Sequence, residues 1–372
     1  MKFLIDTIPF DEHASAVEWA LKRRGHSTRM LHLTDHPAIL PLSLHLQNGR
    51  TSFGFTNLAG ETFSEAFDVA LTRRRRPNNL SSSLAPADVE FAKRQSQIIS
   101  EGLYPYVDVK GMWVNPPASR RNTSLKPLQL ALAARSGLQV PDTLISNSFE
   151  DVVSFCRQQG GKVAFKPLEP GTWTNGAGSS WFSYTVVLDQ AELERQRASI
   201  EASAGIYQHY VEKAFELRVV VMGRSCFSAR LDSQDHADTM VDWRHAHHSN
   251  ADLRASHHAL DQAIQDACFE FMDAMDLVFG VFDFAVGKDG KTYFLEVNPM
   301  GQFLFLDTIS SLPLLQIFAD FLESNDPRFA WQGSDDPVRF ADFWRSAEKT
   351  HLYEHVYPRH TPVPLGSFLY VE

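Results

Sequence analysis

Three oxygen-bearing side chains occur on two neighbouring segments that both have the pattern of β-strands. Asp283 lies in "VFDFAV", and Glu296 and Asn298 lie in "FLEVN". A turn at 288–290 would fold these segments into a hairpin and place position 283 roughly opposite 296. Because strand side chains alternate between two faces, Glu296 and Asn298 point the same way. Three oxygen ligands suit magnesium or manganese, with the remaining coordination positions left for phosphates and water.

Cationic side chains that could meet such phosphates are spread along the chain. Lys166 ends the apolar, β-branched segment "VAFKPL", where an inward-facing lysine is costly unless it meets an anion. The alternative for Lys166 is an exposed position at the end of a strand. The other cationic candidates are Lys126, Arg218 and Arg244.

A glycine-rich segment at 170–180, "PGTWTNGAGSS", follows soon after Lys166. Glycines let backbone N–H groups approach phosphates closely, so this segment could close over a nucleotide as a lid. It matches neither the Walker sequence nor G-x-G-x-x-G. A merely flexible turn is the alternative interpretation.

The overall composition is that of an ordinary globular protein, with 44% hydrophobic and 22% charged residues. A formal net charge of −10 argues against nucleic acid as a general partner. We see no apolar run long enough to span a membrane and no signal-peptide pattern at the start. The three cysteines lack the spacing of a disulfide framework or a zinc ribbon. We therefore expect a soluble cytoplasmic protein.

The 372 residues suffice for several lobes with a large core. Residues 1–118 alternate strand and helix patterns and end on the double proline at 116–117. We expect a small lobe over 119–205, a larger lobe with the hairpin over 206–326, and a C-terminal extension over 327–372. The expected fold class is α/β, with lobes of α+β character.

Several local predictions follow from capping residues and periodicity. Thr123 or Ser124 would cap a helix that Gly137 ends. A long helix is expected at about 257–276 and a shorter one at about 337–349. Leu295 and Val297, on the strand face opposite Glu296, are expected in the core. The extension could dock substrate, mediate self-association or pack on the preceding lobe.

The order of these parts resembles the ATP-grasp superfamily over about 1–325. It is most similar to the microviridin-type, or graspetide, maturases, which crosslink ribosomally made peptides. The resemblance implies an ATP-grasp fold preceded by the N-terminal domain that such ligases share. The segments that carry it are "DEHASAVEWALKRRGH", "RRRRP", "WVNPP", "SLKPLQLALAARSGLQVPDTLIS", "VAFKP", "QHYVEKAFELRVVVMG", "VDWR" and "FLEVNPMGQFLF".

The resemblance also implies roles for particular residues. Lys126 and Lys166 would contact nucleotide phosphates, and Arg218 and Arg244 would act as catalytic cations on the transferred phosphoryl group. Asp283, Glu296 and Asn298 would hold magnesium. The adenine-binding hinge would be Gln208, His209, Tyr210 and Val211, followed by Glu212 or, preferably, Glu216 on the ribose. The family often has an acidic residue where this chain has His209, but a hinge acts mostly through its backbone.

The function that this resemblance implies is an ATP-dependent carboxylate–amine or carboxylate–hydroxyl ligase. Phosphoryl transfer from ATP converts a poor acylating agent, the carboxylate, into an acyl phosphate whose phosphate leaves easily. The favoured substrate is an acidic precursor peptide, joined side chain to side chain as an ester or amide, and a homodimer is one further option. The alternatives are a ligase that adds a free amino acid to an acid, and a nucleotide-binding scaffold or sensor without turnover.

Two further clusters have both a structural and a functional interpretation. The run Arg73–Arg76 could guide an acidic peptide or phosphate, or could be a solvated strand end. A histidine-rich stretch could in principle bind zinc, but its spacing fits no regular site. The histidines are His236, His245, His247, His248, His257 and His258.

Overall fold

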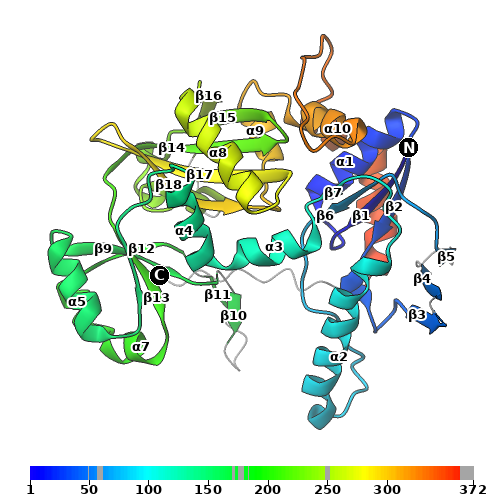
Figure 1. Cartoon of the computed structure of the whole chain (residues 1–372), viewed down its shortest axis with the longest axis horizontal. Helices are drawn as coiled ribbons and strands as arrows, with labels where there is room; N and C mark the ends of the chain where they lie inside the picture. The colour runs from blue at the N-terminus through cyan, green and yellow to red at the C-terminus, as the bar shows by residue number, and fades with distance from the viewer. Residues whose placement is uncertain are drawn as a thin grey trace.

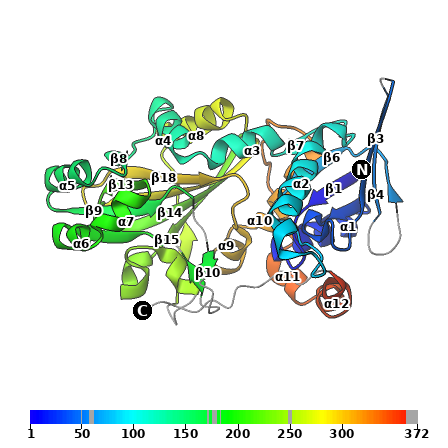
Figure 2. The same ribbon diagram turned by 90° about the horizontal axis from the view of Figure 1, so that it is seen from below.

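The computed structural model describes residues 1–48, 50–56, 62–169, 172–174, 180–182, 184–247 and 252–360. The strands form several sheets, and helices pack beside these sheets (Figures 1 and 2). The predicted mixed α and β fold class is confirmed. No helix in these ranges is long and apolar enough to cross a membrane.

The first lobe is built on a four-stranded parallel sheet with the order β2-β1-β6-β7. Its strands are β1 (Lys2–Asp6), β2 (Ser27–Leu31), β6 (Val69–Thr72) and β7 (Trp113–Val114). A separate antiparallel sheet contains β3 (Leu42–Gln47), β4 (Arg50–Thr56) and β5 (Thr62–Phe63). The two helices are α1 (Glu12–Arg23) and α2 (Val89–Gly102).

Helix α1 begins where the Asp11 carboxylate accepts hydrogen bonds from the backbone N–H groups of His13 and Ala14, at 3.1 and 3.4 Å. Such a cap satisfies donors that have no partner inside the helix. The next residues, from His13 to Leu21, are all buried. The start of α1 is thereby fixed against the rest of the molecule.

Two consecutive helices, α3 (Pro117–Ser124) and α4 (Lys126–Arg135), connect the first lobe to the others. The prediction that Thr123 or Ser124 caps α4 is wrong. Both hydroxyls donate to carbonyls one turn earlier, because these residues themselves belong to α3. Proline is favoured in the first turn of a helix, so the double proline starts α3 instead of only ending a strand.

The small lobe contains an antiparallel sheet with the order β12-β9-β13-β8. Its strands are β8 (Thr143–Ser146), β9 (Lys162–Pro167), β12 (Val186–Asp189) and β13 (Gly205–His209). A two-stranded ribbon of β10 (Thr172–Thr174) and β11 (Ser180–Phe182) accompanies them. The helices are α5 (Phe149–Gln158), α6 (Gln190–Arg195) and α7 (Arg197–Ala202).

The large lobe contains a five-stranded antiparallel sheet with the order β16-β15-β14-β17-β18. The strands are β14 (Lys213–Met222), β15 (Ser225–Leu231), β16 (Ala255–His257), β17 (Phe279–Gly287) and β18 (Thr292–Asn298). Helix α8 (Gln262–Ala274) starts later than predicted, because Ala255–His257 pair with β15 and Asp261 caps the helix. Figure 1 shows α8 and α4 lying over this sheet.

The hairpin of β17 and β18 has the predicted pairing, with Asp283 opposite Glu296. A β-bulge follows, because Phe284 pairs with Phe294 and one residue of β18 is left over. The prediction that Leu295 belongs to the core holds only in part: Leu295 packs against a small buried cluster of Val211, Ala285 and Tyr293, but after the bulge it also lines the pocket described below. Val297 is buried, as predicted.

The C-terminal extension packs across two parts of the molecule. Helices α9 (Leu304–Ile309) and α10 (Leu314–Ser324) precede it, and α11 (Phe340–Trp344) and α12 (Ala347–His351) replace the predicted single helix. Arg339 forms an ion pair of 2.9 Å with the buried Asp307 of α9. Tyr357 hydrogen-bonds Ser15 of α1 at 2.5 Å. The extension therefore braces the first lobe against the segment that follows the hairpin (Figure 2).

We expect Phe343→Ala to destabilise the protein by about 3–5 kcal/mol, because this ring is fully buried. Its centroid lies 5.9 Å from that of Trp19 on α1. The neighbouring Trp344 is 42% exposed, so Trp344→Ala is the matched control and should cost much less. Denaturant unfolding followed by circular dichroism measures both. Equal losses in the two variants would contradict this packing.

Candidate active site

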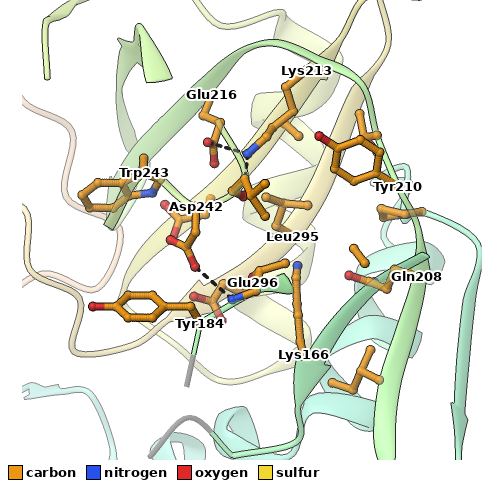
Figure 3. A pocket seen from close by; sticks show the side chains of 18 of the residues that line it. Lys166, Tyr184, Gln208, Tyr210, Lys213, Glu216, Asp242, Trp243, Leu295 and Glu296 are labelled. Atoms are coloured by element: carbon orange, nitrogen blue, oxygen red, sulfur yellow. Dashed lines mark hydrogen bonds and ion pairs between the residues drawn. The ribbon is translucent and has the colours of Figure 1, made fainter. Parts of the chain in front are cut away.

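A pocket between the small-lobe and large-lobe sheets gathers most of the predicted site residues (Figure 3). Strands β9 and β13 contribute one wall, and β14, β17 and β18 contribute the other. The predicted residues that line it are Lys126, Lys166, Gln208, His209, Tyr210, Val211, Glu216, Arg244, Asp283 and Glu296. Arg218, Glu212 and Asn298 are not among the lining residues.

Each of the two facing carboxylates is paired with a cation from another element. Lys126, in the first turn of α4, donates to Glu296 with an Nζ–Oε2 distance of 2.5 Å. The Nη1 atom of Arg218, on β14, donates hydrogen bonds to both carboxylate oxygens of Asp283, at 2.7 and 2.9 Å. Strand pairing explains the second contact, because Arg218 lies directly opposite Asp283.

These carboxylates differ in protonation behaviour because their surroundings differ. Burial raises the pKa of Glu296, but Lys126, Arg244 and Lys166 outweigh burial and lower it to about 2. Burial raises the pKa of Asp283, and the nearby Glu296 adds to that rise while Arg218 opposes it. Two carboxylates held side by side favour a cation between them. The donor set therefore fits a magnesium ion, with Asn298 two residues beyond Glu296.

Asn298 occupies the last position of β18 and is exposed. Its Oδ1 accepts a hydrogen bond of 2.9 Å from the backbone N–H of Met300. One lone pair of the amide oxygen is thus used for the turn that follows the strand, and the other is available to a cation. The side chain remains on the same strand face as Glu296.

Lys166, near the end of β9, points into the pocket toward Glu296 and Asp242 (Figure 3). Burial lowers its pKa to about 8, with Lys126 and Arg244 acting in the same direction and Glu296 in the opposite one. A buried ammonium group is costly to keep charged, and an anionic ligand beside it stabilises the charged form. The structure thus supports the inward-facing interpretation of Lys166 over the exposed one.

The predicted hinge runs along the end of β13 and the turn after it. Gln208 is buried, and its Nε2 donates to the Thr143 hydroxyl at 2.9 Å. The Nδ1 of His209 lies 3.0 Å from Oε1 of Gln159, at the C-terminal end of α5. Tyr210 and Val211 follow where β13 has ended, at the rim of the pocket.

The structure separates the two glutamates proposed for the ribose. Glu212 is exposed and pairs with Lys162 at 3.2 Å, away from the pocket. Glu216 lines the pocket and accepts from Lys213 at 2.8 Å. Burial raises the pKa of Glu216, against the opposing effect of Lys213. We therefore keep Glu216 alone as the candidate ribose ligand.

Sequence reasoning missed several residues of this pocket, among them Lys213, Tyr184 and Asp242. Asp242 holds Arg244 through two hydrogen bonds of 2.8 and 2.5 Å. Burial raises the pKa of Asp242, but the bonds from Arg244 outweigh it and lower the pKa to about 2. The pairing was visible in the segment "VDWR", where an aspartate two residues before an arginine can orient it.

Arg218 is held from several sides. Its Nε and Nη2 donate to the carbonyl of Gln302 at 3.1 and 2.6 Å. The guanidinium also lies 5.0 Å from the ring centroid of Trp243 and 5.7 Å from that of Phe305. Arg218 is held in place by its bonds to the Gln302 carbonyl and to Asp283. It therefore orients the Asp283 carboxylate and also contributes positive charge.

The basic run at 73–76 divides into structural and surface residues. Arg73 is fully buried and pairs with Asp11 at 3.1 Å. Arg75 donates to the Ser100 carbonyl at 3.2 Å and stacks 4.8 Å from the ring centroid of Tyr104. The interpretation of the run as a solvated strand end is wrong for Arg73, whose partner lies 62 residues away in sequence. Arg74 and Arg76 are partly buried.

Two other predictions concern segments with undescribed residues. The glycines proposed for the lid, Gly171, Gly176 and Gly178, lie outside the described residues, as does His248. Among the residues that the structure describes, no group of three or more His, Cys, Asp or Glu side chains could hold a metal ion. His245 instead lies against Tyr184, with a centroid separation of 3.9 Å.

The chain matches no family model and no curated protein at a significant level, so the comparison rests on solved structures. A RiPP-associated ATP-grasp ligase from Chryseobacterium gregarium, in complex with ADP and a leader and core peptide, is 22% identical with a TM-score of 0.78. That alignment covers 91% of this chain and 99% of the ligase.

Two macrocyclases from Microcystis aeruginosa MRC are also similar. MdnC, bound with precursor peptide MdnA, is 23% identical over 87% of this chain and 100% of its own, with a TM-score of 0.76. MdnB is 26% identical over 86% of this chain and 98% of its own, with a TM-score of 0.70. The resemblance predicted from the sequence motifs is therefore confirmed at the level of the fold, which this chain shares with a RiPP-associated ATP-grasp ligase and with two macrocyclases.

Proposed function

We propose that the protein is an ATP-dependent, ADP-forming ligase that activates a carboxylate. The observation that carries this proposal is the juxtaposition of Asp283 and Glu296 on paired strands, with Lys126 and Arg218 bound to them. Phosphoryl transfer depends on positioning and on stabilising charge spread over several oxygens. A pocket that concentrates cations around two carboxylates supplies both.

Each group has a distinct task in this reaction. Lys126 and Lys166 would bind nucleotide phosphates, Glu216 the ribose, and the hinge from Gln208 to Val211 the adenine edge. Asp283, Glu296 and Asn298 would hold magnesium, which supplies charge neutralisation on the phosphates when bound. Arg244 lines the pocket and is oriented by Asp242, so it needs little rearrangement to meet developing charge. Arg218 would add positive charge from behind Asp283, which it holds in place.

The substrate that we propose is a ribosomal precursor peptide with acidic side chains, which would be joined to an amine or hydroxyl of the same peptide. The ligase from Chryseobacterium gregarium carries a leader and core peptide, and MdnC a precursor peptide. Tethering donor and acceptor in one chain raises their effective concentration.

Three unpaired cysteines, Cys156, Cys226 and Cys268, fit a reducing compartment such as the cytoplasm.

The first prediction concerns the product. Incubated with ATP, Mg2+ and its cognate peptide, the protein should release one ADP and one phosphate for each water that the peptide loses. Nucleotide chromatography and mass spectrometry of the peptide measure these quantities. A mass gain by an amino acid would favour the alternative amino-acid ligase, AMP would exclude an acyl phosphate, and no turnover with bound nucleotide would favour a sensor.

The second prediction concerns the cation ligands. Glu296→Ala should lower turnover by at least about 100-fold, because it removes a charge that positions the nucleotide and its metal. Glu296→Gln keeps an acceptor for Lys126 and should lose activity similarly while preserving the thermal unfolding midpoint. Glu212→Ala, at an exposed acidic residue outside the pocket, is the control and should retain activity. Full turnover by folded Glu296→Gln protein would refute the assignment.

The third prediction concerns pH. Lys166 has a pKa of about 8 in the free site, so it is charged below pH 8 and loses its proton as the pH rises further. Nucleotide binding above pH 8 must then restore that proton, and the affinity for ADP should fall by up to about tenfold per pH unit. Isothermal titration calorimetry between pH 7 and 9 measures this loss.

Lys166→Arg is the matched variant, because a guanidinium keeps its charge over this range. Its affinity should change much less between pH 7 and 9 than that of the wild type. Equal pH dependence in the two proteins would assign the titration to another group.

A further inference from the structure

The strand that carries Glu296 and Asn298 lies at the edge of its sheet. Among the described strands, β18 pairs with β17 only. The backbone groups on its outer side therefore need other hydrogen-bond partners, because unpaired buried N–H and C=O groups are costly. Side chains and backbone from the connection between the first lobe and the small lobe provide them.

Gln129 on α4 takes the place of a neighbouring strand at one position. Its Nε2 donates to the carbonyl of Val297 and its Oε1 accepts from the N–H of Val297, both at 3.0 Å. Nε2 also donates to the Thr123 carbonyl at 3.0 Å. The side chain is 1% exposed, and it does not line the pocket. It therefore acts on the backbone, away from substrate.

The side chain of Asn115 likewise holds backbone groups, at the turn that follows β18. Its Nδ2 donates to the carbonyls of Phe279 and Pro299, both at 2.8 Å. Its Oδ1 accepts from the N–H groups of Val278 and Phe279, both at 2.9 Å. This 1% exposed amide thus ties the first residues of β17 to the residue that follows β18.

The contacts hold the backbone directly after each of the two cation ligands on β18. Val297 lies between Glu296 and Asn298, so holding both its N–H and its C=O fixes the peptide planes on either side. Asn115 fixes the chain one residue beyond Asn298. Lys126, which contacts Glu296, lies three residues before Gln129 and thus nearly one turn earlier on the same helix. Ligand side chains need positions fixed to within about half an ångström.

We propose that Gln129 and Asn115 are positioning residues for the cation site, which hold the backbone around Glu296 and Asn298 in the geometry that binds a divalent ion. This inference rests on the proposed function, because it assumes that these residues bind such an ion with a nucleotide. Residues behind metal ligands commonly change metal affinity about 10–100-fold when replaced. A purely structural amide would change stability alone.

The test compares Gln129→Met with the wild type. Methionine has a similar length but cannot hydrogen-bond Val297. Electron paramagnetic resonance of free Mn2+, titrated into protein saturated with ADP, measures the affinity without requiring turnover. We expect Gln129→Met to bind Mn2+ about 10–100-fold more weakly. Its affinity for ADP in the presence of EDTA should stay within about twofold, because the hinge is untouched.

Gln316→Met is the matched control, because Gln316 also accepts from a backbone N–H, that of Val338 at 3.1 Å, and lies on α10. It should lower the thermal unfolding midpoint and leave Mn2+ affinity unchanged. If Gln129→Met does not fold, Gln129→Asn keeps an amide that is one methylene too short to bridge both groups of Val297.

The outcomes separate the two proposals. Folded Gln129→Met or Gln129→Asn protein that binds Mn2+ as tightly as the wild type would overturn the positioning role and leave the proposed function standing. A wild type that binds no Mn2+ with ADP would overturn the proposed function itself. An equal loss of Mn2+ affinity in Gln316→Met would show that any loss of stability has this effect, and would also overturn the positioning role.

Discussion

The placement of two carboxylates opposite each other on β17 and β18 is the constraint on which the rest of the site depends. Two like charges in a partly buried pocket repel each other, and neither is well hydrated. Lys126 on α4 and Arg218 on β14 offset this repulsion directly. Lys166 on β9 adds positive charge from the opposite wall, and Arg244, oriented by Asp242, adds more. The pocket is thus a cluster of paired charges in which a metal and phosphates would replace some of the existing ionic partners.

Such a cluster requires backbone precision across elements that are distant in sequence. Buried uncharged side chains supply much of it, including Gln129, Asn115 and His13, whose Nε2 accepts from the N–H groups of Phe303 and Leu304 at 2.9 Å. Burial lowers the pKa of His13 well below its usual value, so this acceptor stays neutral. The same loop presents the Gln302 carbonyl to Arg218. The first lobe therefore supports the site, although none of its described residues lines the pocket.

Local patterns were sufficient to predict the hairpin, the facing pair of Asp283 and Glu296, and the inward lysine on β9. Each depends on short-range rules of strand alternation and turn composition, which operate within a few residues. The predictions failed where a local pattern admits two outcomes. A threonine or serine near the start of a helix can cap it, but Thr123 and Ser124 belong to the preceding helix α3. An alternating strand places Leu295 wholly in the core, but next to a bulge it is only partly buried and also lines the pocket.

The sequence by itself thus determined which residue types were available for cation and phosphate binding, and in which order along the chain. The tertiary structure decided which of them meet. Arg73 proved to be a buried partner of Asp11, and Glu212 a surface partner of Lys162, although both had matched functional patterns. Gln129 and Asn115 acquired their roles only through folding. The physical reason is that burial and polar pairing depend on contacts between segments far apart in the chain, such as Asn115 and Pro299, which are separated by 184 residues, and such contacts leave no local periodicity in a single sequence.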